Sequence, residues 1–253
     1  MPNPGFSACV TAIAALALLP ACEDATPTNL ESGASAAFAA AEELPPFPAP
    51  GDFVPAVTNP LFPLIPGTVF RYRTETDEGV ETGVVTVTNQ TKTILGVQAT
   101  VVHDQVFLDG VLIEDTFDWY AQDRWGNVWY LGEASCEIVN NQCASTEGSW
   151  EAGVDGAEAG IIMWADPAAH KGESYRQEFY EDVAEDMAKV VHVNLSVEVT
   201  AGDFTGCVET MDWTPLERGA REHKFYCAGT GLVLEVHPSG GNGRNELVSV
   251  TQP

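Results

Sequence analysis

Basic residues are scarce in this chain. Lysine and arginine together number 11 in 253 residues, against 37 aspartates and glutamates, which gives a formal net charge of −26 at pH 7. Residues 1–58 contain no basic residue at all, and the rest of the chain is also acidic in excess. A field of this sign repels nucleic acid and anionic lipid head groups. The composition therefore excludes a nucleic-acid partner and favours an acidic surface suited to a salty or extracellular medium, with specific cation binding as the alternative.

The common catalytic motifs are also missing. The sequence contains no Gly-x-Ser-x-Gly, His-Glu-x-x-His, Gly-x-x-x-x-Gly-Lys or Gly-x-Gly-x-x-Gly pattern. These patterns are typical of serine hydrolases, zinc proteases and nucleotide-binding enzymes. Asp155-Gly156 lies in a glycine-rich stretch, but the alternating acids of an EF-hand calcium loop are absent around it. If the protein is an enzyme, it belongs to a class that works without these motifs.

The N-terminal residues have the pattern of an export signal. Residues 10–19 form an apolar run that is too short to span a bilayer and is followed by small residues. The next stretch, Leu19-Pro20-Ala21-Cys22, resembles the bacterial lipobox. That resemblance implies removal of residues 1–21 as a lipoprotein signal peptide, lipidation of Cys22, and an exported protein anchored to a bacterial membrane. The alternative is an ordinary cleaved signal followed by a chance cysteine.

Cysteines after the lipobox are even in number. They are Cys136, Cys143, Cys207 and Cys227. An even number in an exported domain indicates disulfide bonds. We predict Cys136–Cys143, because Asn140-Asn141 favours a turn between them, and Cys207–Cys227, which bracket two expected strands. A zinc site is the competing interpretation, but the short Cys-x-x-Cys spacing that zinc sites commonly use is absent.

Composition divides the exported part into a linker and a domain. Residues 22–58 are rich in alanine, proline and acids, which predicts a flexible linker. Residues 59–253 contain many short runs of β-branched and aromatic residues separated by turn residues, and Asp109-Gly110 is the clearest hairpin signal. The predicted fold class is mainly β. We expect a single antiparallel, strongly curved sheet or half-barrel of about a dozen strands, with a long central loop at residues 145–172.

The candidate ligand site centres on residues 112–133, which read as two aromatic strands. Side chains alternate between the faces of a strand, so an apolar row is expected on one face and an acidic and hydroxyl row on the other. We expect the apolar row to hold the strand and the polar row to bind a ligand beneath the glycine-rich loop at residues 145–172. The predicted ligand-binding residues are Glu114, Asp118, Tyr120, Glu151 and Asp155. A solvated sheet face is the alternative.

Two further polar clusters are candidates for chemistry. The first offers carboxylate oxygens of the kind that Ca²⁺ prefers, which makes Ca²⁺ the candidate cofactor: Glu178, Glu181, Asp182, Glu185 and Asp186. The alternative is a charged, exposed turn or helix. In the second cluster His223 is a candidate general base next to Glu222 and Lys224. A surface histidine among mixed charges is the alternative there.

Several phrases resemble a family of secreted bacterial β-rich proteins to which no activity is assigned. They are NPLFPLIPGTVFRYR, EDTFDWYAQDRWGNVWYLGE, EGSWEAGVDGAEAGIIMWADP, YRQEFYEDVAEDMAKV and EHKFYCAGTGLVLEV. The resemblance covers most of residues 59–251 and implies a common fold without catalytic roles. The succession of strands behind a lipobox also resembles the curved half-barrel of LolA and LppX envelope lipoproteins, which is an architectural analogy.

Together these patterns predict a lipid-anchored envelope protein with one β domain. We expect it to bind a ligand or partner on an acidic, aromatic-lined face and not to catalyse a reaction. The alternatives are a hydrolase that works through carboxylates or a divalent cation, and a purely structural surface lipoprotein. A concave pocket that holds Glu114 or Asp118 with another acid and a histidine would favour the hydrolase.

Overall fold

The computed structural model describes residues 44–239 and 243–253. The predicted signal peptide, Cys22 and most of the predicted linker lie outside these residues. Within them, 17 strands join into one sheet, which confirms the predicted mainly β, strongly curved fold. No helix among these residues is long and apolar enough to cross a membrane.

One wall of the molecule is a run of long antiparallel strands. Its members are β2 (Val69–Thr76), β3 (Gly79–Ile94), β4 (Val97–Leu108), β5 (Val111–Asp123) and β6 (Val128–Ala134), each paired with the next. Asp109 and Gly110 join β4 to β5 with positive φ angles of 48° and 82°. Two successive positive φ angles make the type I′ turn that suits the right-handed twist of a hairpin, so the hairpin predicted here is confirmed.

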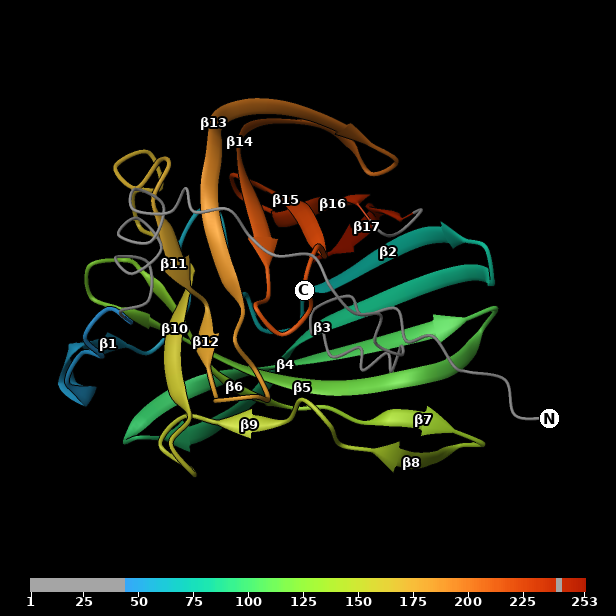
Figure 1. Ribbon diagram of the computed structural model, residues 1–253. Coiled ribbons are helices and arrows are strands. Elements are labelled where there is room, and N and C mark those ends of the chain that lie inside the picture. Colours follow the sequence, from blue (N-terminus) through green and yellow to red (C-terminus); the bar gives the residue numbers. More distant parts are fainter. Residues whose placement is uncertain (1–43, 240–242) are drawn as a thin grey trace, which may run out of the picture.

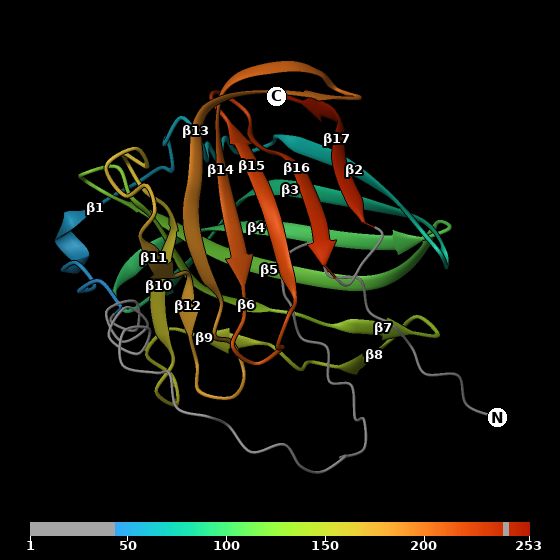
Figure 2. The ribbon, with the colours of Figure 1, turned by 45° about the horizontal axis from the view of Figure 1, so that its top comes forward.

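The second wall is formed by the C-terminal strands. They are β13 (Met187–Val199), β14 (Gly202–Trp213), β15 (Arg221–Cys227), β16 (Gly231–Ser239) and β17 (Arg244–Thr251). Figures 1 and 2 show β13 to β16 running across the long strands of the first wall. The walls are joined on one side where β17 pairs with β2.

On the other side the sheet closes through short strands. β10 (Glu158–Met163) pairs with β6, and two adjoining strands, β11 (Ser174–Arg176) and β12 (Glu178–Phe179), pair with β13 and β10 respectively. Gly160 permits this closure, because a Cβ atom there would lie 2.5 Å from the carbonyl oxygen of Arg176. The result is a nearly closed, barrel-like sheet with an interior between the two walls.

Residues 145–172, which the sequence presented as a long loop, contribute to the sheet. They contain β9 (Trp150–Glu151) and β10, and Ile161 and Met163 of β10 are buried. The segment therefore contributes two strands to the wall. The prediction that it is one continuous loop lying over the polar row is corrected accordingly. The sequence suggested a loop because glycines recur through the segment and Pro167 follows its one apolar run, whereas in the fold β10 has β6 as a partner.

The outer face of β5 and β6 is covered by the chain that precedes β2. A short 3₁₀ turn, η1 (Pro50–Asp52), leads into β1 (Phe53–Val54), which pairs with β5. The ring of Phe47 lies 5.3 Å from that of Trp129, and Val57 is buried. Residues 44–58, which the sequence assigned to the flexible linker, thus pack on the domain in the structure.

Both predicted disulfides are present. Cys136–Cys143 joins the residue before β7 (Glu137–Val139) to β8 (Gln142–Ser145) at an exposed hairpin, with the Cα atoms 5.6 Å apart. Cys207–Cys227 links β14 to β15, with the Cα atoms 4.0 Å apart, and both of its cysteines are fully buried. The buried bridge fixes two strands of the second wall to one another.

Candidate functional site

A cavity lies between the two walls. It leaves about 90 Å³ open to the centres of water molecules, which is room for several waters or a small ligand. The first wall lines it with Tyr72, Asp118 and Tyr120, and the second wall with Lys224 and Leu232. Asp118 and Tyr120 of the polar row of β5 therefore face the space between the walls.

Apolar and polar residues divide the lining of this cavity. The apolar part includes the loop before β2, where the ring of Phe62 lies 5.1 Å from Tyr120 and 6.1 Å from Tyr226 and so bridges the two walls. Leu64, Phe70 and Leu232 continue this apolar surface; the polar side chains of the lining, tyrosines aside, are Asp104, Asp118, Gln177, Glu178, Asp186, Lys224 and Thr230. A cavity with an apolar surface and a few convergent polar groups is the usual form of a small-molecule site.

Two carboxyl groups on the first wall share one phenol. The hydroxyl of Tyr130 lies 2.7 Å from Oδ1 of Asp118 and 3.0 Å from Oε2 of Glu133. A phenol has a single proton to donate, so it cannot fully satisfy two carboxylates, and a proton on one of the two carboxyl groups is favoured. Burial accounts for this, because it raises the pKa of Asp118 to about 7 and the pKa of Glu133 well above its usual range.

The second wall holds one buried cation among carboxylates. Nζ of Lys224 lies 2.8 Å from Oε1 of Glu222 and 3.4 Å from Oδ2 of Asp212. Burial alone would lower the pKa of Lys224, but these two carboxylates raise it well above its usual range. Lys224 is therefore charged, and in return it lowers the pKa of Glu222 although burial acts in the opposite direction.

For two acids between the walls, the nearby positive charge of Lys224 does not offset the effect of burial on the pKa. Burial raises the pKa of Asp186 to about 7 although Lys224 acts against it, and burial together with Asp186 raises the pKa of Glu178 well above its usual range. Gln177 beside them is also buried, and its Nε2 has no hydrogen-bond partner. The polar part of the cavity thus contains acids that favour a proton or a cation and a buried donor that lacks an acceptor.

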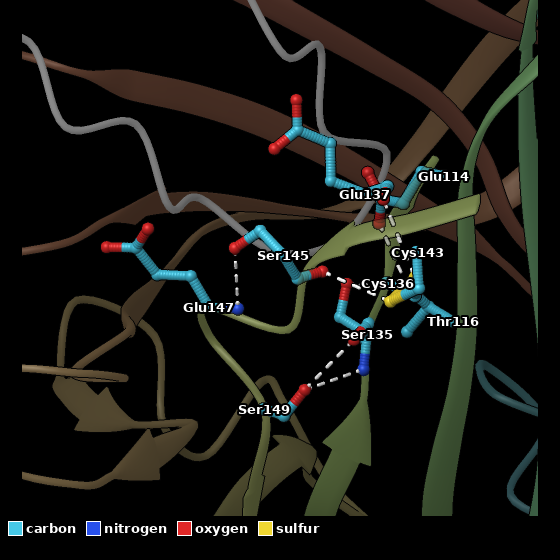
Figure 3. The surroundings of a disulfide bond; sticks show 9 residues. All are labelled: Glu114, Thr116, Ser135, Cys136, Glu137, Cys143, Ser145, Glu147 and Ser149. Carbon is cyan, nitrogen blue, oxygen red and sulfur yellow. Dashed lines mark hydrogen bonds between the residues drawn. A yellow bond between two sulfur atoms is a disulfide. The ribbon is translucent and has the colours of Figure 1, made fainter. Parts of the chain in front are cut away.

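The predicted ligand residues are divided by the fold. Asp118 and Tyr120 line the cavity. Glu114 lies farther along β5 next to the β7–β8 hairpin, where it pairs with Glu137 in the ladder (Figure 3). Glu151 is on the outside and forms an ion pair with Lys92 at 2.7 Å, and Asp155 lies in an exposed turn. Only part of the predicted set converges on one place.

The predicted calcium cluster is divided in the same way. Glu178 and Asp186 line the cavity, whereas Glu181 and Asp182 are exposed and Glu185 accepts a hydrogen bond from the backbone N–H of Asp182. These five carboxylates do not surround a common point. His223, the candidate general base, lies on the outer face of β15, where its Nδ1 is 2.6 Å from Oε1 of Glu209.

Sequence reasoning missed most of the second wall of the site. Lys224 and Tyr226 line the cavity, and Gln177 and Asp104 complete it. One signal was available: residues 222, 224 and 226 alternate with His223 and Phe225, so Glu222, Lys224 and Tyr226 share one face of a strand. The charges on that face suggested exposure, and only the opposite wall makes the face interior.

Comparisons with known proteins give a fold likeness only. No family model matches the chain, and no curated protein matches it. One similar structure is a protein of Bacteroides fragilis considered to be exported, with a YmcC-like fold, at 15% identity, 76% coverage of this chain, 98% of that chain and a TM-score of 0.45. Another is a protein of Parabacteroides distasonis considered to be a lipoprotein, at 11% identity, the same two coverages and a TM-score of 0.41. The analogy with LolA and LppX stays a prediction.

Proposed function

We propose that the protein is an exported envelope protein that binds a small amphipathic molecule in the cavity between its two walls. The observation that carries this proposal is the two-part lining: Phe62, Leu64 and Leu232 on the apolar side, and Asp118 and Glu178 on the polar side. The apolar part of the ligand lies against the first set. Its head group contacts the second.

The charges favour a cationic head group, such as a primary amine. Among the described residues, the polar lining contains Asp104, Asp118, Glu178 and Asp186 against one cation, Lys224. Burial raises the pKa values of Asp118, Glu178 and Asp186, and repulsion from Asp186 and Asp118 adds to the rise for Glu178. An ammonium group placed among them replaces bound protons and offsets the charge that burial disfavours. An anionic head group would add to the repulsion.

A larger hollow on the other side of the loop before β2 suits this ligand less well. It leaves about 530 Å³ open to the centres of water molecules and shares Pro63, Phe70 and Thr230 with the cavity. Among the described residues its lining contains no charged side chain, so it offers no charge to hold a cationic head group. We assign it the role of an entrance, with the loop that carries Phe62 and Pro63 between it and the cavity.

The cellular location in this proposal is inferred mainly from the sequence. Leu19-Pro20-Ala21-Cys22 supports export and a lipid anchor at Cys22, and the two disulfides fit an oxidising compartment. Residues 22–43 would then connect the anchor to the domain. On this proposal residues 1–21 are a signal peptide and the binding domain begins before residue 59.

A pair of matched probes tests the binding proposal. We expect a medium-chain primary alkylamine to raise the melting temperature of the purified protein, and the carboxylate of the same chain length to leave it unchanged. Asp118→Asn should reduce the amine effect because it removes one of the acids, whereas Glu151→Gln, on the outer surface, should not. Equal shifts with amine and carboxylate, or none with either, would contradict a cation-selecting cavity.

One observation favours a second candidate, a hydrolase that works through carboxylates. Asp118 and Glu133 are held by one phenol with their pKa values raised, and carboxyl pairs of unequal protonation serve as acid and base in such enzymes. However, no histidine of the described residues lines the cavity. Turnover of chromogenic glycoside or ester substrates that is lost in Asp118→Asn would favour this candidate over simple binding.

A further inference from the structure

Three potential metal ligands meet on β15 and β16, beyond the lining of the cavity. One ligand atom from each of Glu222, Glu235 and His237 lies within 4.8 Å of the other two. Nε2 of His237 is 3.1 Å from Oε1 of Glu235 and 3.9 Å from Oε2 of Glu222. None of these residues was singled out as a ligand by the sequence, because Glu235 and His237 lie in an otherwise apolar strand.

The group contains a buried oxygen without a donor. Glu235 is 1% exposed, and its Oε2 has no hydrogen-bond partner. A carboxylate oxygen left in this state loses its hydration without compensation. Asn245, the cross-strand neighbour of Glu235, is also buried, and its Nδ2 has no partner. Both atoms indicate that the protein side chains alone do not complete the polar interactions at this point.

The separations suit a metal ion. Two ligand atoms that are each about 2.1 Å from one ion in a tetrahedral site lie about 3.4 Å apart. The two distances from His237 Nε2, 3.1 Å and 3.9 Å, fall on either side of that value. Imidazole combined with carboxylates suits first-row divalent ions such as Zn²⁺.

The surroundings orient the ligands and leave a way in. Lys224 holds Oε1 of Glu222 at 2.8 Å, which leaves Oε2 directed at His237, as outer-shell partners commonly do in metal sites. The side chain of His237 is 31% exposed, so an ion can reach it from solvent. Gly243 leaves room for the imidazole, because a Cβ atom there would lie 2.9 Å from Cδ2 of His237.

We propose that Glu222, Glu235 and His237 bind one divalent transition-metal ion, with Zn²⁺ as the best-fitting chemistry and water at the remaining position. The carboxylates of Glu222 and Glu235 balance the charge of such an ion, the imidazole binds it as a neutral ligand, and the carboxylate of Asp212 balances Lys224. The site differs from the five carboxylates that the sequence offered for Ca²⁺, and it does not depend on the ligand of the cavity.

Calorimetric titration of the chelator-treated, dialysed protein with ZnCl₂ tests this proposal. We expect one ion per chain, and binding weakened by at least about tenfold in Glu235→Gln and in His237→Gln. The second variant is the more informative one, because a partly exposed histidine can be replaced with little disturbance of the interior. Circular dichroism establishes that each variant is folded.

His223→Gln is the matched control. His223 is on the same strand as Glu222 but faces outward, where it and His192 share Glu209. Its replacement should leave the zinc affinity unchanged. Co²⁺ gives a second readout, because its visible absorption in the wild-type protein should be lost in His237→Gln and retained in His223→Gln. If Zn²⁺ does not bind, or if only the outer histidine affects its binding, the proposal is wrong.

Discussion

The hydroxyl of Tyr130 lies 2.7 Å from a carboxylate oxygen of Asp118, inside the walls of the sheet. This hydrogen bond lowers the pKa of Asp118, yet burial outweighs it and the pKa rises from 3.8 to about 7. Asp118 is therefore an acid that folding forces towards its protonated form. The stability of the protein consequently depends on pH.

The unfolding free energy should fall as the pH rises from about 4 to about 7. Between these values the folded protein holds a proton on Asp118 that the unfolded chain releases, so stability is complete below the ordinary pKa and is lost as the pH approaches the raised one. Neighbouring groups with raised pKa values are Glu114, Tyr120, Tyr130, Glu133 and Glu178. The acids act in the same direction, and the tyrosines are neutral throughout this range.

Melting temperatures of Asp118→Asn measured from pH 5 to pH 8 check this prediction. Asparagine is neutral at every pH and can still accept the Tyr130 hydrogen bond, so the variant should melt above the wild type at pH 8 and close to it at pH 5. Glu147→Gln, which changes an exposed acid, should follow the wild-type curve. A wild-type melting temperature that rises over this range would show that the sign is wrong.

Lys224→Met should destabilise the protein by about 3–5 kcal/mol. The substitution leaves Glu222 and Asp212, both buried, without their shared cation. Urea unfolding followed by tryptophan fluorescence measures the loss. Adding Glu222→Gln to this variant should recover part of it, because the second change removes one of the two uncompensated charges, and a single variant as stable as the wild type would contradict the pairing.

The two disulfides should contribute unequally to stability. The Cys207–Cys227 bridge closes a sequence separation of 20 residues and the Cys136–Cys143 bridge one of 7. Chain entropy then gives about 3 kcal/mol for the first and about 2 kcal/mol for the second. Replacing Cys207 and Cys227 with alanine also leaves a space in a buried contact, so this pair should cost clearly more in urea unfolding than the exposed pair. The reverse order would contradict the packing described above.

We predict that Cys22 is lipidated, which can be tested in cells that express the protein. Cys22→Ala should leave the protein either unprocessed or in the soluble fraction, because the acyl chains that would hold it on the membrane have no attachment point. Fractionation and the mass of the N-terminal peptide measure both outcomes. Ser7→Ala, a change within the predicted signal, serves as the control and should leave processing unaffected. Normal processing and membrane retention of Cys22→Ala would show that the lipobox interpretation is wrong.

The sequence predicted local structure well because local structure depends on neighbouring residues. Asp109-Gly110 allows the positive φ angles of its turn, and the alternation along β5 placed Asp118 and Tyr120 together on one face. The two disulfides also followed from local brackets. In each case the pattern and the residues that it organises lie within about twenty positions of one another.

The closed cavity could not be predicted in this way. It depends on pairings such as β10 with β6 and β17 with β2, and periodicity does not say which strand meets which. The same limit explains Lys224, whose charged neighbours suggested a solvated surface until the opposite wall enclosed them. Phe47 and Phe53 were assigned to the linker from its proline content, although they cover Trp129.

The pairing of β17 with β2 has a consequence for how the chain reaches its folded state. The register places Thr251 opposite Val69, so the last strand completes a contact with the first long one. The chain is synthesised from its N-terminus, and β2 is therefore present before its partner. Until β17 arrives, one edge of the first wall has free backbone groups that can pair with another chain. The interval between the synthesis of these two strands is thus a period in which that edge is open to pairing between chains.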